Sequence, residues 1–159
     1  MYPRTHFVVG LIFSIIILFS IKEISLFNFL VVVIFFLSSI LIDSDHYIYY
    51  VVKKKDTSLE KAYRWFIERT GKIDSIPFEK QKEYKKIFLV FHGIEFWIFL
   101  YILSNSFYIF APILFGFLFH MIFDWIDILD KGNGWGVFFS RVSWIYLLLG
   151  NKNKKEFKF

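Results

Sequence analysis

Four histidines and several acidic residues of this chain lie inside or directly beside long apolar segments. Asp43, Asp45 and His46 directly follow the apolar run 27–42, and His6 opens the first apolar run. A carboxylate at the centre of a lipid bilayer costs about 2.5–3.5 kcal/mol, and less near the edge. Polar side chains in such places therefore predict a function. Imidazole and carboxylate together suit zinc, manganese or iron.

Two further polar pairs lie inside later apolar segments at helical spacing. His92 and Glu95 are three residues apart, and His120 and Asp124 are four apart, so each pair shares one helix face. Four imidazoles with the acids near them exceed what one ion can coordinate, so we expect one or two divalent metal ions. The expected ligands are His6, Asp43, Asp45, His46, His92, Glu95, His120 and Asp124. The catalytic candidates are Asp45 and Glu95, with Glu95 as a ligand or the general base.

Each of these residues also has a plainer interpretation. His6 alone is typical of a polar residue at a membrane interface, and the stretch 43–46 of a helix stop. His92 with Glu95 could form one buried hydrogen-bonded pair, and Asp127 could be a water-exposed acid. Zinc is the first expectation for the metal, with manganese or iron as alternatives. The chain has no cysteine, which excludes thiolate ligands and disulfides.

The composition indicates that lipid, rather than water, surrounds much of the chain. The 159 residues suit one domain, and 57% of them are hydrophobic, with 23% aromatic and a mean hydropathy of +0.52. A core of this size cannot hide so much apolar surface. We therefore expect an all-α integral membrane protein with a retained first helix. The four expected spans are residues 4–21, 26–50, 87–104 and 107–129, each near the ~20 residues a span requires.

Two other segments are expected to lie at the membrane surface. The insertion 53–86 is basic, and its apolar residues recur at helical spacing between Thr57-x-x-Glu60, a capping box, and a stop at Gly71. This helix either lies on the membrane or packs over the end of the bundle. The apolar segment 137–149 is too short to span, so we expect an interfacial or re-entrant helix after a glycine-rich loop.

Four spans would put both termini and the insertion on one side of the membrane. That side would hold every Lys and Arg except Lys22, so the positive-inside rule makes it cytoplasmic. All the candidate ligands would then lie in the cytoplasmic half of the bundle. The expected location is the cytoplasmic membrane, with several passes.

Short motifs of the chain resemble those of the YdjM-type membrane-bound metal-dependent hydrolases. They are Thr5-His6 before the first span, Asp43-Ser-Asp45-His46 closing the second, and Gly116-x-x-x-His120-x-x-x-Asp124 before a Gly136-Val137 turn. The family is distantly similar to zinc-dependent phospholipase C and the S1/P1-type nucleases. The resemblance covers most of the chain except 53–86, and it implies an all-α metal-dependent hydrolase of phosphoesters. Many members carry His-Arg-Gly-x-Thr-His-Ser at the third span, where this chain has His92-Gly-Ile-Glu95.

The sequence therefore predicts a membrane-embedded hydrolase that cleaves a phosphoester, most plausibly in a lipid, with metal-activated water. Lipid is the expected surrounding and the possible substrate, and no nucleic-acid partner is expected. The alternative is a non-catalytic metal-binding membrane protein, either with a structural metal or as a metal or proton transporter. Polar residues through both leaflets would favour a transporter, and the outer halves of the predicted spans nearly lack them.

Overall fold

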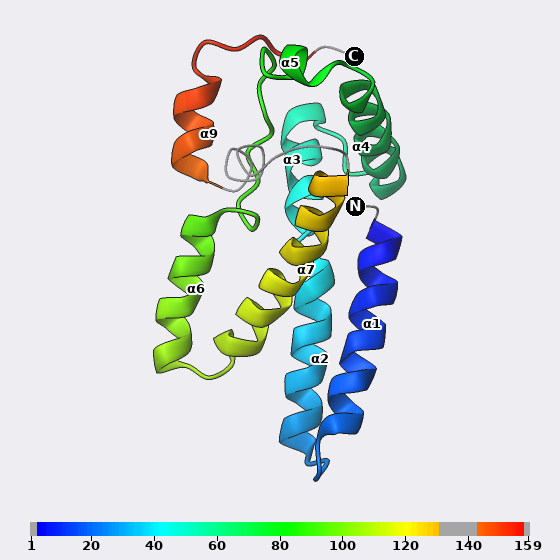
Figure 1. Cartoon of the computed structure of the whole chain (residues 1–159), viewed down its shortest axis with the longest axis vertical. Helices are drawn as coiled ribbons and strands as arrows, with labels where there is room; N and C mark the ends of the chain where they lie inside the picture. The colour runs from blue at the N-terminus through cyan, green and yellow to red at the C-terminus, as the bar shows by residue number, and fades with distance from the viewer. Residues whose placement is uncertain (1–2, 131–142, 158–159) are drawn as a thin grey trace.

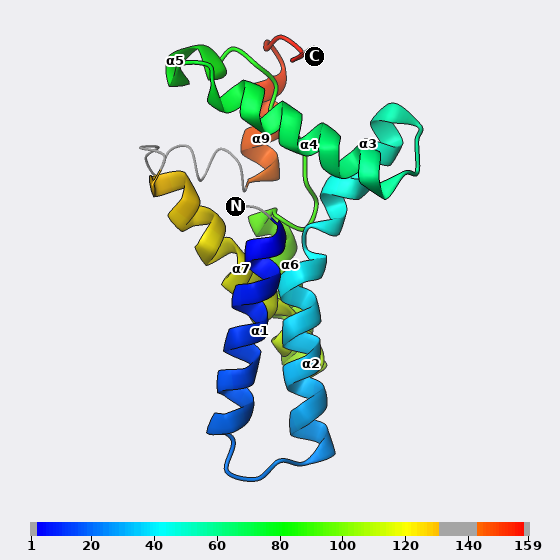
Figure 2. The same cartoon turned by 90° about the vertical axis from the view of Figure 1, so that its right-hand side faces the viewer.

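The computed structural model describes residues 3–130 and 143–157, which form an all-helical protein, as predicted. The helices are α1 (Pro3–Ser20), α2 (Leu26–Leu41), α3 (Ser44–Lys54), α4 (Leu59–Asp74), α5 (Phe78–Gln81), α6 (Ile94–Ser106), α7 (Phe110–Asp130) and α9 (Trp144–Asn151). Helix α2 packs between α1 and α7, and α6 packs on α7 (Figure 1). Helices α3, α4, α5 and α9 gather toward one end, and the α1–α2 and α6–α7 connections lie toward the other (Figures 1 and 2).

Small residues bring α1, α2 and α7 into close contact. A Cβ on Gly116 of α7 would lie 2.6 Å from the Phe35 carbonyl oxygen and 3.0 Å from the Ser39 nitrogen, both backbone atoms of α2. A Cβ on Gly10 of α1 would lie 2.7 Å from Ser39 Oγ. Close backbone approach at small residues is a common way for helices to associate in lipid. Gly116 thus sets the distance between α7 and α2 one turn before His120.

Few large apolar side chains are buried, and many face outward. The buried cluster consists of Ile42, Trp97, Leu100, Leu114, Phe117 and Met121. By contrast, Phe19 and Tyr108 are 83% and 87% exposed. Among the described residues, Leu26–Lys54 and Phe110–Asp130 are long and apolar enough to cross a membrane, and the apolar helices Arg4–Ser20 and Ile94–Ser106 are shorter. That the four expected spans cross a membrane stays a prediction.

The second expected helix, 26–50, is interrupted just before its polar residues. A turn at Asp43 separates α2 from α3. The Asp43 N–H bonds to the Ile40 carbonyl at 3.2 Å, whereas a continuous helix would bond it to the Ser39 carbonyl. The carboxylate of Asp43 makes no hydrogen bond to the start of α3. The turn therefore leaves both the Ser39 carbonyl and the Asp43 carboxylate available to the bundle interior.

The third expected helix, 87–104, begins later than predicted. Helix α6 starts at Ile94, after Gly93 in extended conformation with φ −79° and ψ 130°. His92 thus lies in the turn before the helix. The prediction that His92 and Glu95 share one helix face is wrong, because the extended residue between them turns their side chains in different directions.

The amphipathic helix of the basic insertion is present as α4, with shifted ends. Ser58, rather than Thr57, caps it, since Ser58 Oγ accepts from the Lys61 N–H at 3.3 Å. The helix continues through Gly71, so the predicted stop there is wrong. Asp56 accepts from Lys61 Nζ at 2.9 Å and from the Ser58 N–H, and these bonds lower the pKa of the Asp56 carboxyl. The α3–α4 connection is thereby fixed.

One face of α4 packs over the bundle end. The Phe66 ring meets the His46 ring edge-on at 4.9 Å, and Trp65 meets Tyr50 at 5.9 Å. This is one of the two placements that the sequence left open. The exposed apolar residues on the helix are Leu59, Tyr63 and Ile67. Contact of these residues with a membrane surface stays a prediction.

The C-terminal helix α9 is short. Its eight residues extend about 12 Å, which is much less than the ~30 Å of a bilayer core, so it does not span. It covers the end of the expected segment 137–149. The expected turn at Gly136-Val137 lies outside the described residues.

Candidate metal centre

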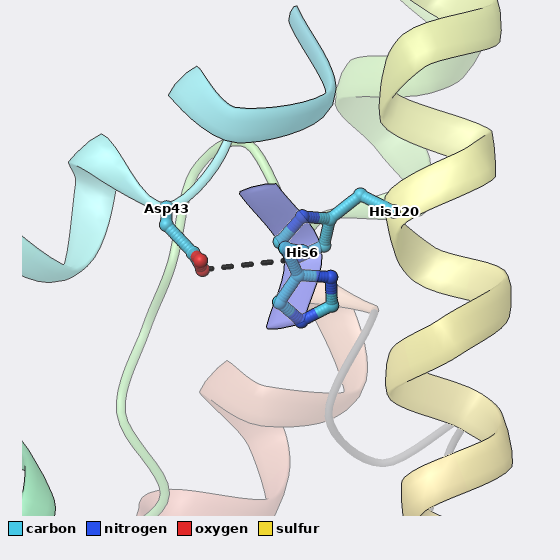
Figure 3. Close-up of side chains that lie close together, drawn as sticks. All are labelled: His6, Asp43 and His120. Atoms are coloured by element: carbon cyan, nitrogen blue, oxygen red, sulfur yellow. Dashed lines mark ion pairs between the residues drawn. The ribbon is translucent and has the colours of Figure 1, made fainter. Parts of the chain in front are cut away.

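The candidate ligands come from four separate parts of the chain and meet in one half of the bundle. His6 comes from the first turns of α1, and Asp43 from the turn between α2 and α3. His120 and Asp124 lie one turn apart on α7. Figure 3 shows the Asp43 carboxylate pointing toward the imidazoles of His6 and His120. His92 reaches the same place from the turn before α6, and its Nε2 lies 3.9 Å from Asp124 Oδ2.

The spacing between nitrogen and oxygen atoms suits ligands of a shared ion. His120 Nε2 lies 3.4 Å from Asp124 Oδ2 and 3.6 Å from Asp43 Oδ1. His92 Nε2 lies 3.7 Å from the same Asp43 oxygen. Neither Nε2 atom forms a hydrogen bond in these contacts. Ligands around a tetrahedral ion with bonds of about 2.1 Å are about 3.4 Å apart, which is close to what the structure shows.

The Nε2 atoms of His92 and His120, at the centre of the cluster, are buried and form no hydrogen bond. His92 is 6% exposed and His120 is 1% exposed, and the Nε2 atom of each lacks a hydrogen-bond partner among the described residues. A buried polar atom without a partner costs about 1–3 kcal/mol. The Nε2 atoms of His92 and His120 face the same two carboxylates, those of Asp43 and Asp124. A cation bound between them would remove this cost.

The ring of His120 is oriented by the backbone of α2. Its Nδ1 lies 2.8 Å from the Ser39 carbonyl oxygen, which can only accept, so Nδ1 carries the proton and donates it. In the neutral ring Nε2 then has a free lone pair, the form in which histidine binds metals. The helix break at Asp43 supplies this acceptor, and Gly116 brings it within reach.

The ring of His92 is oriented by Asp45. The Nδ1 of His92 donates to Asp45 Oδ2 at 3.0 Å, and the Phe91 N–H donates to the same oxygen at 2.9 Å. A carboxylate behind a metal-binding histidine is a common arrangement, which fixes the ring and its tautomer. Asp45 is 4% exposed and belongs to none of the groups whose atoms converge. The structure therefore places Asp45 Oδ2 behind His92, and the role of Asp45 as a ligand or catalytic group stays a prediction.

His6 and His46 complete the cluster on opposite sides. His6 stacks on His120 with ring centroids 3.7 Å apart, and its Nε2 is 3.0 Å from Asp124 Oδ1. His46 Nδ1 lies 3.2 Å from Asp45 Oδ1 and 3.4 Å from Asp43 Oδ1. The side chain of His46 is 32% exposed, more than any other member of the cluster. Approach from outside is thus easiest beside His46, where α3 meets α4.

Glu95 lies elsewhere, which corrects its prediction as a ligand or general base. Its Oε1 accepts from Ser143 Oγ at 2.9 Å and from the Ile145 N–H at 3.2 Å, and its Oε2 accepts from the Trp144 N–H at 2.9 Å. These donors form the N-terminus of α9, where free N–H groups favour a negative charge. Glu95 therefore holds α9 to α6. Asp127 also belongs to none of the converging groups.

Three overlapping groups of ligand atoms lie within 4.8 Å of one another. They are His6 with Asp43 and His120, Asp43 with His46 and His92, and His92 with His120 and Asp124. Six of the eight predicted ligands thus converge, and these buried His/Asp clusters could hold a metal ion. Comparisons with family models, curated proteins and solved structures find no match for this chain.

Several supporting residues were not predicted from the sequence. The Ser39 carbonyl orients His120, and the indole N–H of Trp97 holds the turn that carries His92 by donating to the Phe91 carbonyl at 2.8 Å. The pair Ser38-Ser39 inside the apolar run 27–42 is the sequence signal that could have indicated the role of Ser39. For Trp97 no sequence signal separates this role from that of a lipid-facing aromatic residue.

Proposed function

We propose that this chain is a multi-pass membrane protein that hydrolyses a phosphoester at a divalent metal centre. The observation that carries the proposal is the pair of buried Nε2 atoms of His92 and His120. Both lack hydrogen bonds and face the carboxylates of Asp43 and Asp124 at 3.4–3.9 Å. The Nδ1 atoms of both rings are hydrogen-bonded, which leaves the two Nε2 lone pairs for a metal.

The cluster has ligands for two ions. The groups His6–Asp43–His120 and Asp43–His46–His92 share Asp43 alone, so their other residues could hold two separate ions. Asp124 adds a further oxygen beside His120. Zinc fits this mixture of imidazole and carboxylate ligands best, with manganese or iron as alternatives.

The chemistry follows from the ligands and their accessibility. Divalent metal at this site would bring the pKa of a bound water toward neutrality and polarise a phosphoryl oxygen. The protein supplies the orientation: Asp45 and the Ser39 carbonyl fix the two central imidazoles. The partly exposed side chains of His46 and Asp43, at 32% and 25%, mark where a substrate would enter. Because the cluster lies among apolar helices, a lipid phosphoester is the preferred substrate class.

The membrane arrangement supports the same proposal. Four helices, α1, α2, α6 and α7, would cross or enter the cytoplasmic membrane, with both termini in the cytoplasm. The basic segment around α4 and the C-terminal lysines would face anionic head groups. Each Lys or Arg near the surface would contribute about 1 kcal/mol of attraction. The resemblance to YdjM-type metal-dependent hydrolases points to the same reaction class. Its histidine-rich third motif is reduced here to His92, since Glu95 holds α9.

A structural metal is the second candidate. The cluster joins four separate segments, namely α1, the α2–α3 turn, the turn before α6, and α7. An ion there would fasten the bundle even without catalysis. In that case all coordination positions would be filled by protein, whereas a catalytic ion keeps one position open.

Metal analysis of detergent-purified protein tests the proposal. We expect one or two divalent ions per chain in the wild type, lost in His120→Ala and kept in the surface control Asp56→Asn. At a free metal concentration of about 1,000 times Kd, binding adds about 4 kcal/mol of stability, so chelation should lower the Tm of the wild type and of Asp56→Asn but not that of His120→Ala. If neither the wild type nor Asp56→Asn contains metal, and neither gains any when zinc, manganese or iron is added, the proposal is overturned.

Assays of the metal-loaded protein separate the two candidates. A catalytic centre should hydrolyse a soluble phosphodiester or a phospholipid, lose activity with a chelator and regain it with metal. A metal-loaded protein without hydrolysis of phosphomonoesters, phosphodiesters or phospholipids would leave the structural metal as the function of the cluster.

A further inference from the structure

A polar cavity lies at the end of the molecule formed by α3, α4 and the C-terminal segment. It encloses about 150 Å³ and is lined by Tyr49, Lys53, Trp65, Arg69, Lys85, Lys86, Phe88, Asn151, Glu156 and Phe157. These elements lie together at one end of the fold (Figure 2). None of the lining residues belongs to the metal cluster.

The lining of this cavity is strongly basic. Four cationic side chains face one carboxylate, that of Glu156. Lys53 Nζ lies 5.8 Å from the centre of the Tyr49 ring and 3.4 Å from its hydroxyl, which are uncharged partners. Within residues 3–130 and 143–157, no carboxylate lies within ion-pair distance of Lys53 or Lys85. Lys53 and Lys85 therefore bring positive charge to the cavity with which no carboxylate of the described residues pairs.

The wall of the cavity is held in place by backbone and amide hydrogen bonds. The side chain of Asn151 accepts from the Lys86 N–H and donates to the Lys86 carbonyl, both at 2.9 Å. The Lys85 N–H donates to the Lys155 carbonyl at 2.9 Å, and the Lys155 N–H donates to the Glu83 carbonyl at the same distance. Two segments distant in sequence are thus joined beside the cavity. Lys85 and Lys86 are positioned before any ligand arrives, which lowers the cost of binding.

We propose that this cavity binds a phosphate group, separately from the metal centre. Its volume is below the ~300–1,000 Å³ of cavities that hold whole drug-sized ligands, so it suits one compact group. A phosphate carries the multiple negative charge that the lysines require, and the guanidinium of Arg69 matches its oxygens. The group can belong to a lipid head group or be free in the cytoplasm, and the chemistry of recognition is the same.

Binding of two probes to the full-length protein in neutral detergent tests this proposal. One probe is inorganic phosphate, followed by calorimetry at fixed ionic strength, and the other is short-chain phosphatidate, counted by native mass spectrometry. Binding of phosphate alone identifies a soluble source, and binding of phosphatidate identifies a lipid source. If neither probe binds, the proposal is wrong.

Charge-matched variants distinguish the cavity from general attraction to a basic surface. Lys53→Gln with Lys85→Gln should weaken binding of the probe about tenfold or more, with the metal content unchanged as a check of folding. The exposed Lys55 and Lys80 lie outside the lining, so Lys55→Gln with Lys80→Gln provides the control, which removes the same charge and should bind as the wild type does. Equal weakening by both changes, or none by the first, would overturn the proposal.

A third variant makes the outcome independent of the metal centre. Asp124→Asn removes a carboxylate of that centre, and the cavity should still bind phosphate in this variant. Loss of phosphate binding in Asp124→Asn that retains its fold would assign the bound phosphate to the metal centre, and would refute a second site. If the wild type binds no metal but still binds phosphate in the cavity, the hydrolase proposal is contradicted and the phosphate site is not.

Discussion

Replacing Asp45 with Asn tests whether this residue orients His92 or binds metal itself. The two side chains have nearly the same shape, so the buried site stays filled. The substitution removes the negative charge behind the His92 ring. The asparagine side chain has one acceptor oxygen, whereas the carboxylate has two. In the wild type, Asp45 Oδ2 accepts two hydrogen bonds, one from His92 Nδ1 at 3.0 Å and one from the Phe91 N–H at 2.9 Å. An asparagine oxygen can keep these bonds only in a weaker, uncharged form.

The expected loss of metal affinity follows from this role. Changing a carboxylate behind a metal-binding histidine typically costs 10–100-fold in metal affinity, which is about 1.4–2.7 kcal/mol. Removing a ligand such as Asp124 should cost more, since the ion loses a bond and a charge. Asp45→Asn should therefore bind metal measurably but more weakly, between the wild type and Asp124→Asn.

Competition with a chelator of known affinity measures this difference on detergent-purified protein. Asp56→Asn is the matched control, because it removes a carboxylate that pairs with Lys61 outside the cluster. An unchanged affinity in Asp45→Asn would show that Asp45 does not act through His92. An affinity as low as that of Asp124→Asn would show that Asp45 binds the metal directly, and would refute the role inferred from the structure.

Two further predictions concern the elements that position the cluster. Gly116→Ala should lower the free energy of unfolding by about 1–3 kcal/mol and weaken metal binding, because the added Cβ meets the backbone of α2 at 2.6 Å. Thermal unfolding with metal titration measures both effects, and Gly71→Ala is the control, since a Cβ there has nothing within 4 Å. Glu95→Gln should leave the metal content unchanged and speed proteolysis near α9, whose N-terminus then loses a charge-assisted contact. A loss of metal in Glu95→Gln with α9 still protected would restore Glu95 as a ligand.

The sequence was sufficient to predict that most of these residues meet, for a physical reason. Helical hairpins return the chain to the same end of a bundle, so polar residues near matching ends of apolar runs come together. His6, Asp43, His92, His120 and Asp124 obey this rule, and all of them converge. The all-helical fold follows equally from the lengths of the apolar runs, which suit membrane-spanning helices. These predictions depend only on the order and length of the apolar segments.

The roles of individual acids could not be predicted in the same way. Glu95 is three residues from His92, yet its partners lie 48–50 positions away, at the start of α9. No local pattern marks the N-terminus of a short distant helix as the partner of a carboxylate. Asp43 and Asp45 are similarly indistinguishable in sequence. The helix break turns one toward the other ligands and the other toward the back of His92, and that depends on the backbone at a single turn.

The break between α2 and α3 and the histidine on α7 depend on each other. A helix interrupted within an apolar bundle leaves a carbonyl without its usual N–H partner, and such a group must be satisfied by the protein. Here that carbonyl is Ser39, and the proton it accepts comes from His120 Nδ1. In an uninterrupted helix the Asp43 N–H would also donate to this carbonyl, and His120 Nδ1 would have to share it. The same turn that exposes the Asp43 carboxylate therefore also sets the tautomer of the imidazole opposite it.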